Sequence, residues 1–554
     1  MRTCFFRILI AWVLVLVECG GTDEALEVCV GAVEVPDANL RALLVELLPK
    51  PSSPEAEDEP EPIVLAEQLA RVRGLKAERL DIESLWGLEC ATGLESLGLA
   101  GNHIADLEPI ASLTGLRELE LSNNDLESVA AIEGLTGLEK LSFADNRVQD
   151  MSPLTSLKQL RHLDASANTI VDISALAELD VLETLVLQGN AVKDISALAN
   201  LTTLFSLVLS NNVIDDIEPL AGLHSLRYLD LDGNEIVTLA PLAELRELLD
   251  LEVTRNRLTN FDGVAGMANL IELTVQSNAI TSTNGVGGLS RLVLLDLSNN
   301  QVADLTGVEN LPGLRRLLLA VNRVTEISSL VALRELRELD LRSNGELSDL
   351  TPLANLPFLA WLGLGGAGVA QDLSPLAGRD LLRTLVYQHS DLTDLSVLGE
   401  LAGLQFLNVE GTTLDEMSLR QIAAATNLQT LTISDCGVAD LTPLAPLTGL
   451  RTLFAERNAL VSLVGLESLH MLQRAELGEN PLAGLTGVEA HEFLALLDVS
   501  STMVDDLAPL VQNETFRSGD RVIATGTLLD AEDCADMAAI IERRAVVESD
   551  VVCP

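Results

Sequence analysis

Asparagine recurs every 22 residues along much of this chain, and this register constrains the fold more than any other feature. Twelve of these residues follow without a break, and two more return to the register near the C-terminal end. They are Asn102, Asn124, Asn146, Asn168, Asn190, Asn212, Asn234, Asn256, Asn278, Asn300, Asn322, Asn344, Asn458 and Asn480. A fixed period of this length is typical of a solenoid, in which each repeat is one turn of a coil.

The residues between the asparagines predict the shape of one coil. Each unit has the form LxxLxLxxN followed by DLxPLxxL, as in "LVLSNNVIDDIEPLAGL" at 207–223. The alternating LxL core predicts a short strand with its leucines facing inward. The segment after the asparagine is short for an α-helix and often carries proline, which suits a turn or a 3-10 helix. The strands should therefore stack into a parallel sheet, with tight turns on the opposite side.

The asparagines themselves are expected to hold the coil together. Where the chain turns inward after the strand, backbone N–H and C=O groups become buried and need partners. An asparagine amide both donates and accepts, so it can pair with the backbone of its own turn and of the next one. We therefore interpret these residues as a structural ladder and not as ligand-binding groups. Thr412 and Cys436, which occupy the same register, should replace part of the pairing.

These motifs carry a resemblance to a known family. LxxLxLxxN at this period, with the continuation "IADLEPIASLTGL" at 104–116, resembles the leucine-rich repeats of the internalin-type subfamily of bacterial surface proteins. The resemblance implies an α/β solenoid: a right-handed coil with a parallel sheet on its concave face, 3-10 or turn segments on its convex face, and a helical N-terminal cap. "VEVPDANLRALLVELL" at 33–48 resembles that cap, with Leu40, Leu43, Leu44 and Leu47 on one side of its helix. No wall-sorting motif is apparent, so the host-receptor roles of particular internalins are not expected to carry over.

The chain divides into four expected segments: a signal peptide at 1–19, an N-terminal cap at 20–74 with an acidic, proline-rich loop at 49–62, about 20 repeats at 75–510, and a C-terminal cap at 511–554. Arg2 and Arg7 precede the apolar run 8–17, which is too short to span a membrane and suits the core of a signal peptide. "LVECGG" resembles a bacterial lipoprotein signal, which would make Cys19 the lipid-modified residue; ordinary cleavage near Gly21 is the alternative. Both readings place the mature protein outside the cytoplasm, secreted or lipid-anchored at the cell envelope.

Four cysteines flank the repeats, two at each end. An exported chain can form disulfides, so we expect Cys534 to pair with Cys553, and Cys29 to pair with Cys90. Cys436 stands alone inside the repeats and should be a buried thiol. No cysteine or histidine has metal-ligand spacing, so no metal and no cofactor are expected.

Charge and motifs restrict the function. A formal net charge of -48 repels phosphate, which excludes nucleic acid and disfavours anionic membranes, so a membrane contact is expected only through the N-terminal lipid. The acidic residues either keep a leucine-rich protein soluble, or they attract a basic partner or bound cations. The histidines are scattered over different units, without a nucleophile beside them, although His162 and Asp164 on one strand could touch. We therefore predict that the protein is not an enzyme.

Recognition should use the strand residues that point away from the leucines. Two groups stand out there, one apolar and aromatic, the other acidic. The first comprises Trp361, Val386, Phe406 and Phe454; the second comprises Tyr228, Asp230, Asp232, Asp250 and Glu252. We predict a monomeric protein that recognises or adheres to a protein or another macromolecule through its concave face. A passive envelope spacer without a dedicated ligand is the alternative.

Overall fold

The computed structural model describes residues 29–48, 64–366, 372–390 and 394–553. The chain forms two compact units, Met1–Asn256 and Arg257–Pro554, which are described separately. The expected signal peptide, Cys19 and the acidic loop at 49–62 lie outside the described residues. Among the helices of the described residues, none has both the length and the apolar character needed to cross a membrane.

In the first unit each repeat contributes one short strand and one 3-10 turn. The strands are β3 (Gly74–Lys76), β4 (Ser96–Gly98), β5 (Glu118–Glu120), β6 (Lys140–Ser142), β7 (His162–Asp164), β8 (Thr184–Val186), β9 (Ser206–Val208), β10 (Tyr228–Asp230) and β11 (Asp250–Glu252). The 3-10 turns are η1 (Leu88–Cys90), η2 (Glu108–Ile110), η3 (Ala130–Ile132), η4 (Ser152–Ser156), η5 (Ser174–Leu176), η6 (Ser196–Leu198), η7 (Glu218–Leu220) and η8 (Ala240–Leu242). Each strand pairs in parallel with the next one along the chain.

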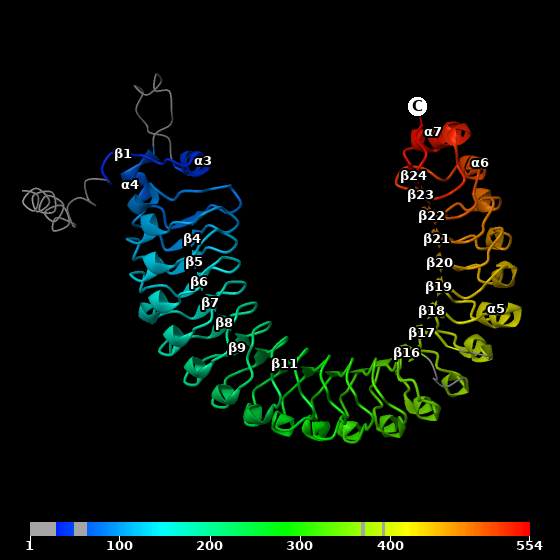
Figure 1. Ribbon diagram of the computed structural model, residues 1–554, viewed down its shortest axis with the longest axis horizontal. Helices are drawn as coiled ribbons and strands as arrows, with labels where there is room; N and C mark the ends of the chain where they lie inside the picture. Colours follow the sequence, from blue (N-terminus) through cyan, green and yellow to red (C-terminus); the bar gives the residue numbers. More distant parts are fainter. Residues whose placement is uncertain (1–28, 49–63, 367–371, 391–393, 554) are drawn as a thin grey trace, which may run out of the picture. The chain divides into compact units, whose positions relative to one another are not determined.

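The second unit continues the same pattern. Its strands are β12 (Glu272–Thr274), β13 (Leu294–Asp296), β14 (Arg316–Leu318), β15 (Glu338–Asp340), β16 (Trp361–Gly365), β17 (Thr384–Gln388), β18 (Phe406–Asn408), β19 (Thr430–Thr432), β20 (Thr452–Phe454), β21 (Arg474–Glu476), β22 (Leu496–Asp498), β23 (Arg521–Ala524) and β24 (Val546–Ser549). Its 3-10 turns are η9 (Val264–Gly266), η10 (Val286–Gly288), η11 (Val308–Asn310), η12 (Ser328–Ala332), η13 (Thr351–Asn355), η14 (Ser374–Leu376), η15 (Ser396–Glu400), η16 (Thr442–Leu444), η17 (Leu466–Ser468), η18 (Val488–Ala490) and η19 (Ala531–Asp533). In each unit the strands line one face and the turns line the opposite face (Figure 1).

The core of each coil is a column of leucines that the strand register aligns. Leu141 on β6 pairs with Leu163 on β7, which pairs with Leu185 on β8, and all three are at most 2% exposed. Because strand neighbours alternate faces, the residues on either side of each leucine point out of the core. The leucine-rich-repeat solenoid predicted from the sequence, with a parallel sheet and 3-10 turns, is confirmed.

One repeat departs from the expectation of short turns. Between Thr412 and Cys436 the chain has two extra residues, and it forms the α-helix α5 (Glu416–Ala423) where its neighbours form 3-10 turns. The Asp415 carboxylate caps this helix by accepting a hydrogen bond from the Ser418 amide at 2.8 Å. A local insertion therefore suffices to exchange the turn type without disturbing the strands on either side.

The asparagines form a ladder of hydrogen bonds between coils. The Oδ1 of Asn124 accepts from the Ile104 amide at 3.0 Å, and its Nδ2 donates to the carbonyls of Leu99 and Leu121. The pattern repeats at Asn146, which binds the Leu126 amide and the carbonyls of Leu121 and Phe143. Each amide thus joins its own turn to the preceding coil. The prediction of a bond to the next coil was wrong, because the inward side chain points toward the preceding coil. It binds a backbone amide and a carbonyl of that coil.

Other residues at the ladder position keep only part of this pairing. Thr412 donates from its hydroxyl to the Tyr387 carbonyl at 3.4 Å. The Cys436 thiol is buried and lies 3.2 Å from the Val409 carbonyl. Burial raises the pKa of this thiol to about 11. Cys436 is therefore a neutral replacement for asparagine in the core.

Aspartates in the DLxPL segment cap the 3-10 turns. In each case one carboxylate oxygen accepts from the backbone N–H two residues further on, which satisfies a donor at the start of the turn. The residues with this bond include Asp106, Asp150, Asp172, Asp194, Asp216, Asp304, Asp349, Asp394 and Asp440. The bond lowers the pKa of several of them, Asp172 and Asp194 among them.

The N-terminal cap covers the first coil with two helices, α3 (Ala38–Leu47) and α4 (Ala66–Leu69), and the antiparallel pair β1 (Ala32–Val33) and β2 (Val64–Leu65). Leu40 and Leu44 of α3 are buried, as expected. Leu47 is 56% exposed, so the predicted apolar face does not extend to the end of the helix. A disulfide joins Cys29 to Cys90 on η1, with the Cα atoms 5.2 Å apart. The cap is therefore fastened covalently to the first coil.

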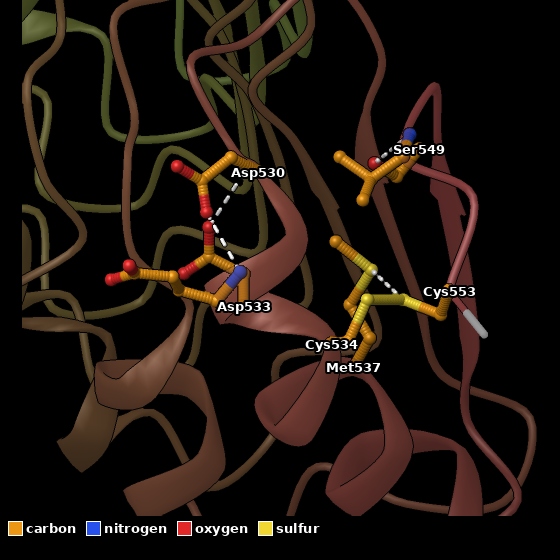
Figure 2. Close-up of a disulfide and its surroundings, with 8 residues drawn as sticks. Asp530, Asp533, Cys534, Met537, Ser549 and Cys553 are labelled. Atoms are coloured by element: carbon orange, nitrogen blue, oxygen red, sulfur yellow. Dashed lines mark hydrogen bonds between the residues drawn. A yellow bond between two sulfur atoms is a disulfide. The ribbon is translucent and has the colours of Figure 1, made fainter.

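The C-terminal cap contains α6 (Ala508–Gln512), α7 (Cys534–Glu542) and the last strand β24. Asp530 and Asp533 form a reciprocal capping box just before α7. A disulfide links Cys534, the first residue of α7, to Cys553 beyond β24, with the Cα atoms 5.5 Å apart (Figure 2). Met537, one turn into the helix, lies beside the bridge, its sulfur 3.8 Å from that of Cys553. The bridge closes this short segment over the end of the solenoid.

Candidate functional site

The apolar and aromatic group lies on the strand face of the second unit, but it is less exposed than the sequence suggests. Trp361 on β16, Phe406 on β18 and Phe454 on β20 are each partly buried. Val386 on β17 is only 7% exposed, so the prediction that it contributes an open surface was wrong. The Trp361 ring lies over Gly363, which is the register partner of Val386, so a large side chain stands beside the short valine.

Trp361 is covered in turn by an arginine from the preceding coil. The Arg342 guanidinium lies 5.6 Å from the centre of the Trp361 ring, a cation–π distance. Three hydrogen bonds to the carboxylate of Asp340, at 2.6 Å, 2.9 Å and 3.1 Å, fix the guanidinium. The hydrogen bonds that Arg342 donates to Asp340 raise the pKa of Arg342. Tryptophan, arginine and aspartate therefore form one ordered unit on the strand face.

A second arginine–aromatic pair stands further along the same sheet. The Arg474 guanidinium lies 5.3 Å from the centre of the Phe454 ring and also binds the Glu476 carboxylate through its Nε at 2.7 Å. Burial raises the pKa of Glu476, and the nearby carboxyl of Glu456 adds to the effect. The motif of the first pair, an aromatic ring under an arginine that a carboxylate holds, thus recurs on the strand face.

These arginines were missed in the sequence. Arg342 is 19 residues before Trp361, and Arg474 is 20 residues after Phe454, so neither stands near its ring in the chain. The usable signal was the repeat itself, because residues about 22 apart occupy neighbouring coils. A comparison of each strand-face residue with the residues about 22 positions away, on the neighbouring coils, would have placed each arginine beside its ring.

The acidic group lies on the strand face of the first unit and is tightly connected. Oxygen atoms of Asp230, Asp232 and Glu252 lie within 4.8 Å of one another. Asp230 is 8% exposed and accepts from the Ser210 hydroxyl at 2.7 Å, while the Tyr228 hydroxyl donates to Glu252 at 3.1 Å. Asp250 is on the adjacent strand and is partly buried. The sequence grouping of these residues therefore corresponds to real proximity.

Burial, with the charge of neighbouring carboxylates, shifts the pKa of two of these groups. Burial raises the pKa of Asp232 to about 6, and the charges of Asp230 and Glu252 add to the increase. A hydrogen bond from the Thr254 amide acts in the opposite direction. Burial also raises the pKa of Tyr228, with Glu252 as the next cause. Three converging carboxylates are a donor set of the kind that divalent cations use, but protein donors already engage each of them.

A shallow hollow of about 430 Å³ opens on the strand face nearer the N-terminus of the first unit. Its lining includes Glu118, Lys140, His162, Asp164 and Thr184. His162 Nδ1 lies 3.2 Å from the Thr184 hydroxyl, whereas Asp164 accepts from Ser166, so the suspected His162–Asp164 contact does not form. The hollow brings together charged and polar groups without the aligned nucleophile and base that acyl-transfer catalysis needs.

Comparison with known proteins supports the repeat assignment. The family described as Leucine Rich repeats (2 copies) matches residues 92–133, 136–178, 202–244 and 312–355. A search of curated proteins finds no match. Among solved structures, a plant peptide hormone receptor, RGFR1, in complex with RGF2, has 16% identity and a TM-score of 0.50, covering 88% of this chain and 97% of the receptor chain. A leucine-rich-repeat protein of Leptospira interrogans has 22% identity and a TM-score of 0.49, covering 76% of this chain and 93% of its own.

An internalin (inlF) from Listeria monocytogenes is more similar in sequence. It shares 31% identity with this chain at a TM-score of 0.55, and the match covers 59% of this chain and 95% of the internalin. This likeness extends over nearly the whole of the internalin, and the family description separately recognises repeats in this chain. The chain therefore belongs to the internalin-type family of bacterial leucine-rich-repeat proteins.

Proposed function

We propose that this chain is a non-enzymatic, extracytoplasmic recognition protein that binds a protein partner through the strand face of its second unit. The contact centres on the two arginine–aromatic pairs, Arg342–Trp361 and Arg474–Phe454, with Phe406 on a strand between them. Val386 is not part of this contact. The acidic group of the first unit, Tyr228 to Glu252, contributes a charged surface that is separate from the centre.

The observation that carries this proposal is the environment of the Trp361 and Phe454 rings. Each is partly buried, and each has a guanidinium above it that a carboxylate holds in place. Tryptophan and arginine dominate the energetic centres of protein interfaces, because they bury much area and lose little freedom when they are already ordered. Only 3% of the residues in this chain are aromatic, so two such pairs on one sheet are a local concentration of the residues that protein interfaces favour.

The kind of partner follows from the fold and the charge. The plant receptor of similar fold is bound to RGF2. A net charge of -48 disfavours a nucleic acid. Leucine-rich repeats present a wide, regular strand face, which suits a folded protein or an extended peptide better than a small molecule. We therefore expect a protein partner and a monomeric binding chain.

The location rests on the N-terminal sequence and the cysteines. Residues 1–19 have the composition of an export signal, and the two cap disulfides fit an oxidising compartment. We propose export, with Cys19 as the site of a lipid anchor. Mass spectrometry of the mature N-terminus distinguishes a diacylglyceryl Cys19 from a free terminus near Thr22, and an intact Met1 would contradict both.

The binding proposal is tested with Trp361→Ala and a matched control, Phe358→Ala. Phe358 is 43% exposed and belongs to the same repeat, but it precedes the strand and lies off the strand face. Proteins captured from envelope and culture supernatant by the wild type are identified, and the affinity of the best candidate is then measured. Trp361→Ala should weaken binding by about 2 kcal/mol, which is about 30-fold, and Phe358→Ala should leave it unchanged.

The competing function is a passive envelope spacer. On that reading the Arg342–Trp361 pair only stiffens the sheet. Trp361→Ala would then lower the urea midpoint of unfolding without changing the set of captured proteins. Equal capture by the wild type and both variants would reject the recognition role of this face.

A further inference from the structure

One buried histidine occupies a position that the repeats reserve for an apolar side chain. Eleven residues after the ladder asparagine, most units place a leucine in the core under the 3-10 turn, and Asn480 is followed at this distance by His491. The leucines at this register include Leu113, Leu135, Leu157, Leu179, Leu201, Leu223, Leu245, Leu289, Leu311, Leu333, Leu447 and Leu469. His491 therefore lies in this stack of core side chains, one repeat before the end of the repeats.

The imidazole of His491 is enclosed and makes no well-formed hydrogen bond, although the Leu469 backbone lies near enough to favour its protonated form. The residue is 1% exposed, and neither ring nitrogen makes a hydrogen bond to a protein group. Its backbone, in contrast, is held on both sides: its N–H donates to Val488, and its carbonyl accepts from the Asn513 side chain at 3.0 Å. The ring therefore cannot reach solvent unless the coil opens, and a proton placed on it would be a buried charge that the carboxylates of Glu467 and Glu489 only partly compensate.

The charged groups around the ring do not offset this burial. Glu467 and the Leu469 backbone on the preceding coil, with Glu489 on its own turn, favour the protonated ring, while His470 opposes it. On the other side α6 carries no ionisable side chain, and Arg543 is occupied with the carbonyls of Val511 and Asn513. Burial is the largest influence, and the pKa of His491 is lowered from its ordinary value.

We propose that His491 acts as an acid-sensitive switch: its protonation opens the next-to-last coil of the repeats and releases the C-terminal cap. At neutral pH the imidazole is neutral and packs as its leucine counterparts do. The opening is local, because each repeat contacts only its neighbours. It spreads to the cap because Asn513 and Arg543 connect the His491 coil to α6 and α7.

The direction of the pH dependence follows from linkage. The unfolded coil binds a proton with an ordinary histidine pKa of about 6.5, and the folded coil binds it less tightly. The stability of the coil is therefore complete above about pH 6.5 and falls as the pH drops toward the lowered value in the folded state. In that window the opening equilibrium should rise by up to about tenfold per pH unit.

Hydrogen exchange of the full chain, measured by mass spectrometry at pH 7 and pH 5 and corrected for the intrinsic rate, tests this proposal. Peptides spanning 488–516 should lose about tenfold or more of their protection at pH 5, while peptides from 152–220 should change little. In His491→Leu, which restores the residue of the other repeats, the extra loss should disappear. His470→Gln, a change at an exposed neighbouring histidine, should retain it.

Two results would overturn the proposal. One is an equal acid-induced loss in the wild type and His491→Leu, which would assign the effect to carboxylates. The other is a His491→Leu chain whose 488–516 segment is already unprotected at pH 7, because leucine would then fail to replace a neutral imidazole. A normal circular dichroism spectrum of His491→Leu at pH 7 confirms that the variant is folded for the comparison.

Discussion

Removing a single ladder asparagine should cost far more stability than removing a surface cap of the same repeat. Asn212 is 7% exposed; its Oδ1 accepts from the Val192 amide at 2.9 Å, and its Nδ2 donates to the carbonyls of Leu187 and Leu209, both at 3.0 Å. Asn212→Ala leaves one buried N–H and two carbonyls without this partner. At about 1–3 kcal/mol for a buried unsatisfied group, with carbonyls at the low end, we expect a loss of about 3–5 kcal/mol.

The matched control is Asp216→Ala in the same repeat. Asp216 is exposed and accepts one backbone hydrogen bond, from Glu218 at 2.9 Å, so its loss should cost about 1 kcal/mol or less. Asn212→Thr should fall between the two, because Thr412 at the same register donates to one carbonyl, although at 3.4 Å. The order of the three variants, and not any one value, is the signature of a ladder.

The assay must be local, because a long repeat array does not unfold as one two-state unit. The Val192 amide is the direct reporter, since Asn212 Oδ1 is its acceptor. A loss of 3 kcal/mol corresponds to about a 100-fold fall in its protection from hydrogen exchange. The reasoning is refuted if the protection of Val192 is unchanged in Asn212→Ala, or if Asp216→Ala lowers the protection of this repeat as much as Asn212→Ala does.

Three further experiments test other parts of the structure. Asp232→Asn should stabilise the first unit at pH 7 by about 1 kcal/mol, after a discount for solvent screening. The pKa of Asp232 is raised to about 6 in the folded protein, so its ionisation destabilises the fold as the pH rises from about 4 through about 6. The gain, measured by urea unfolding, should therefore vanish at pH 4. Cys534→Ser with Cys553→Ser should weaken the C-terminal cap by about 3 kcal/mol, seen as faster proteolysis within 511–553, while the repeats keep their circular dichroism. Cys436, with a thiol pKa of about 11, should react with iodoacetamide at pH 8 only after denaturant is added, and labelling of the native chain would show that the coil opens there.

Much of the fold was accessible from the sequence because a solenoid repeats one local solution. The LxL strand, the inward asparagine and the turn-capping aspartate each act within a single coil or between a coil and its neighbour, at a constant distance along the chain. Leu163 and Asn168 illustrate this, since each has the burial or the bond that its position in the repeat predicts. The two helical replacements of a turn, α5 and α6, occur where the repeat is lengthened or ends.

The candidate site was predicted less well, because it depends on side chains from different coils. The sequence placed Trp361 and Val386 on the strand face, but Val386 is buried beside the Trp361 ring, which lies over Gly363. Strand alternation decides only the face of the sheet toward which a side chain points. Its solvent exposure depends on the size and the rotamers of its neighbours, which no single repeat specifies.

The sequence by itself determined the coil: its period, its strand, its ladder and the covalent ends formed by Cys29–Cys90 and Cys534–Cys553. Only the tertiary structure decided that each asparagine binds the preceding coil, that Arg342 covers Trp361, and that the imidazole of His491 is enclosed without a well-formed hydrogen bond. The physical reason is that a repeat pattern encodes the backbone of one turn. Contacts between turns arise from packing, where burial and charge depend on every neighbouring side chain.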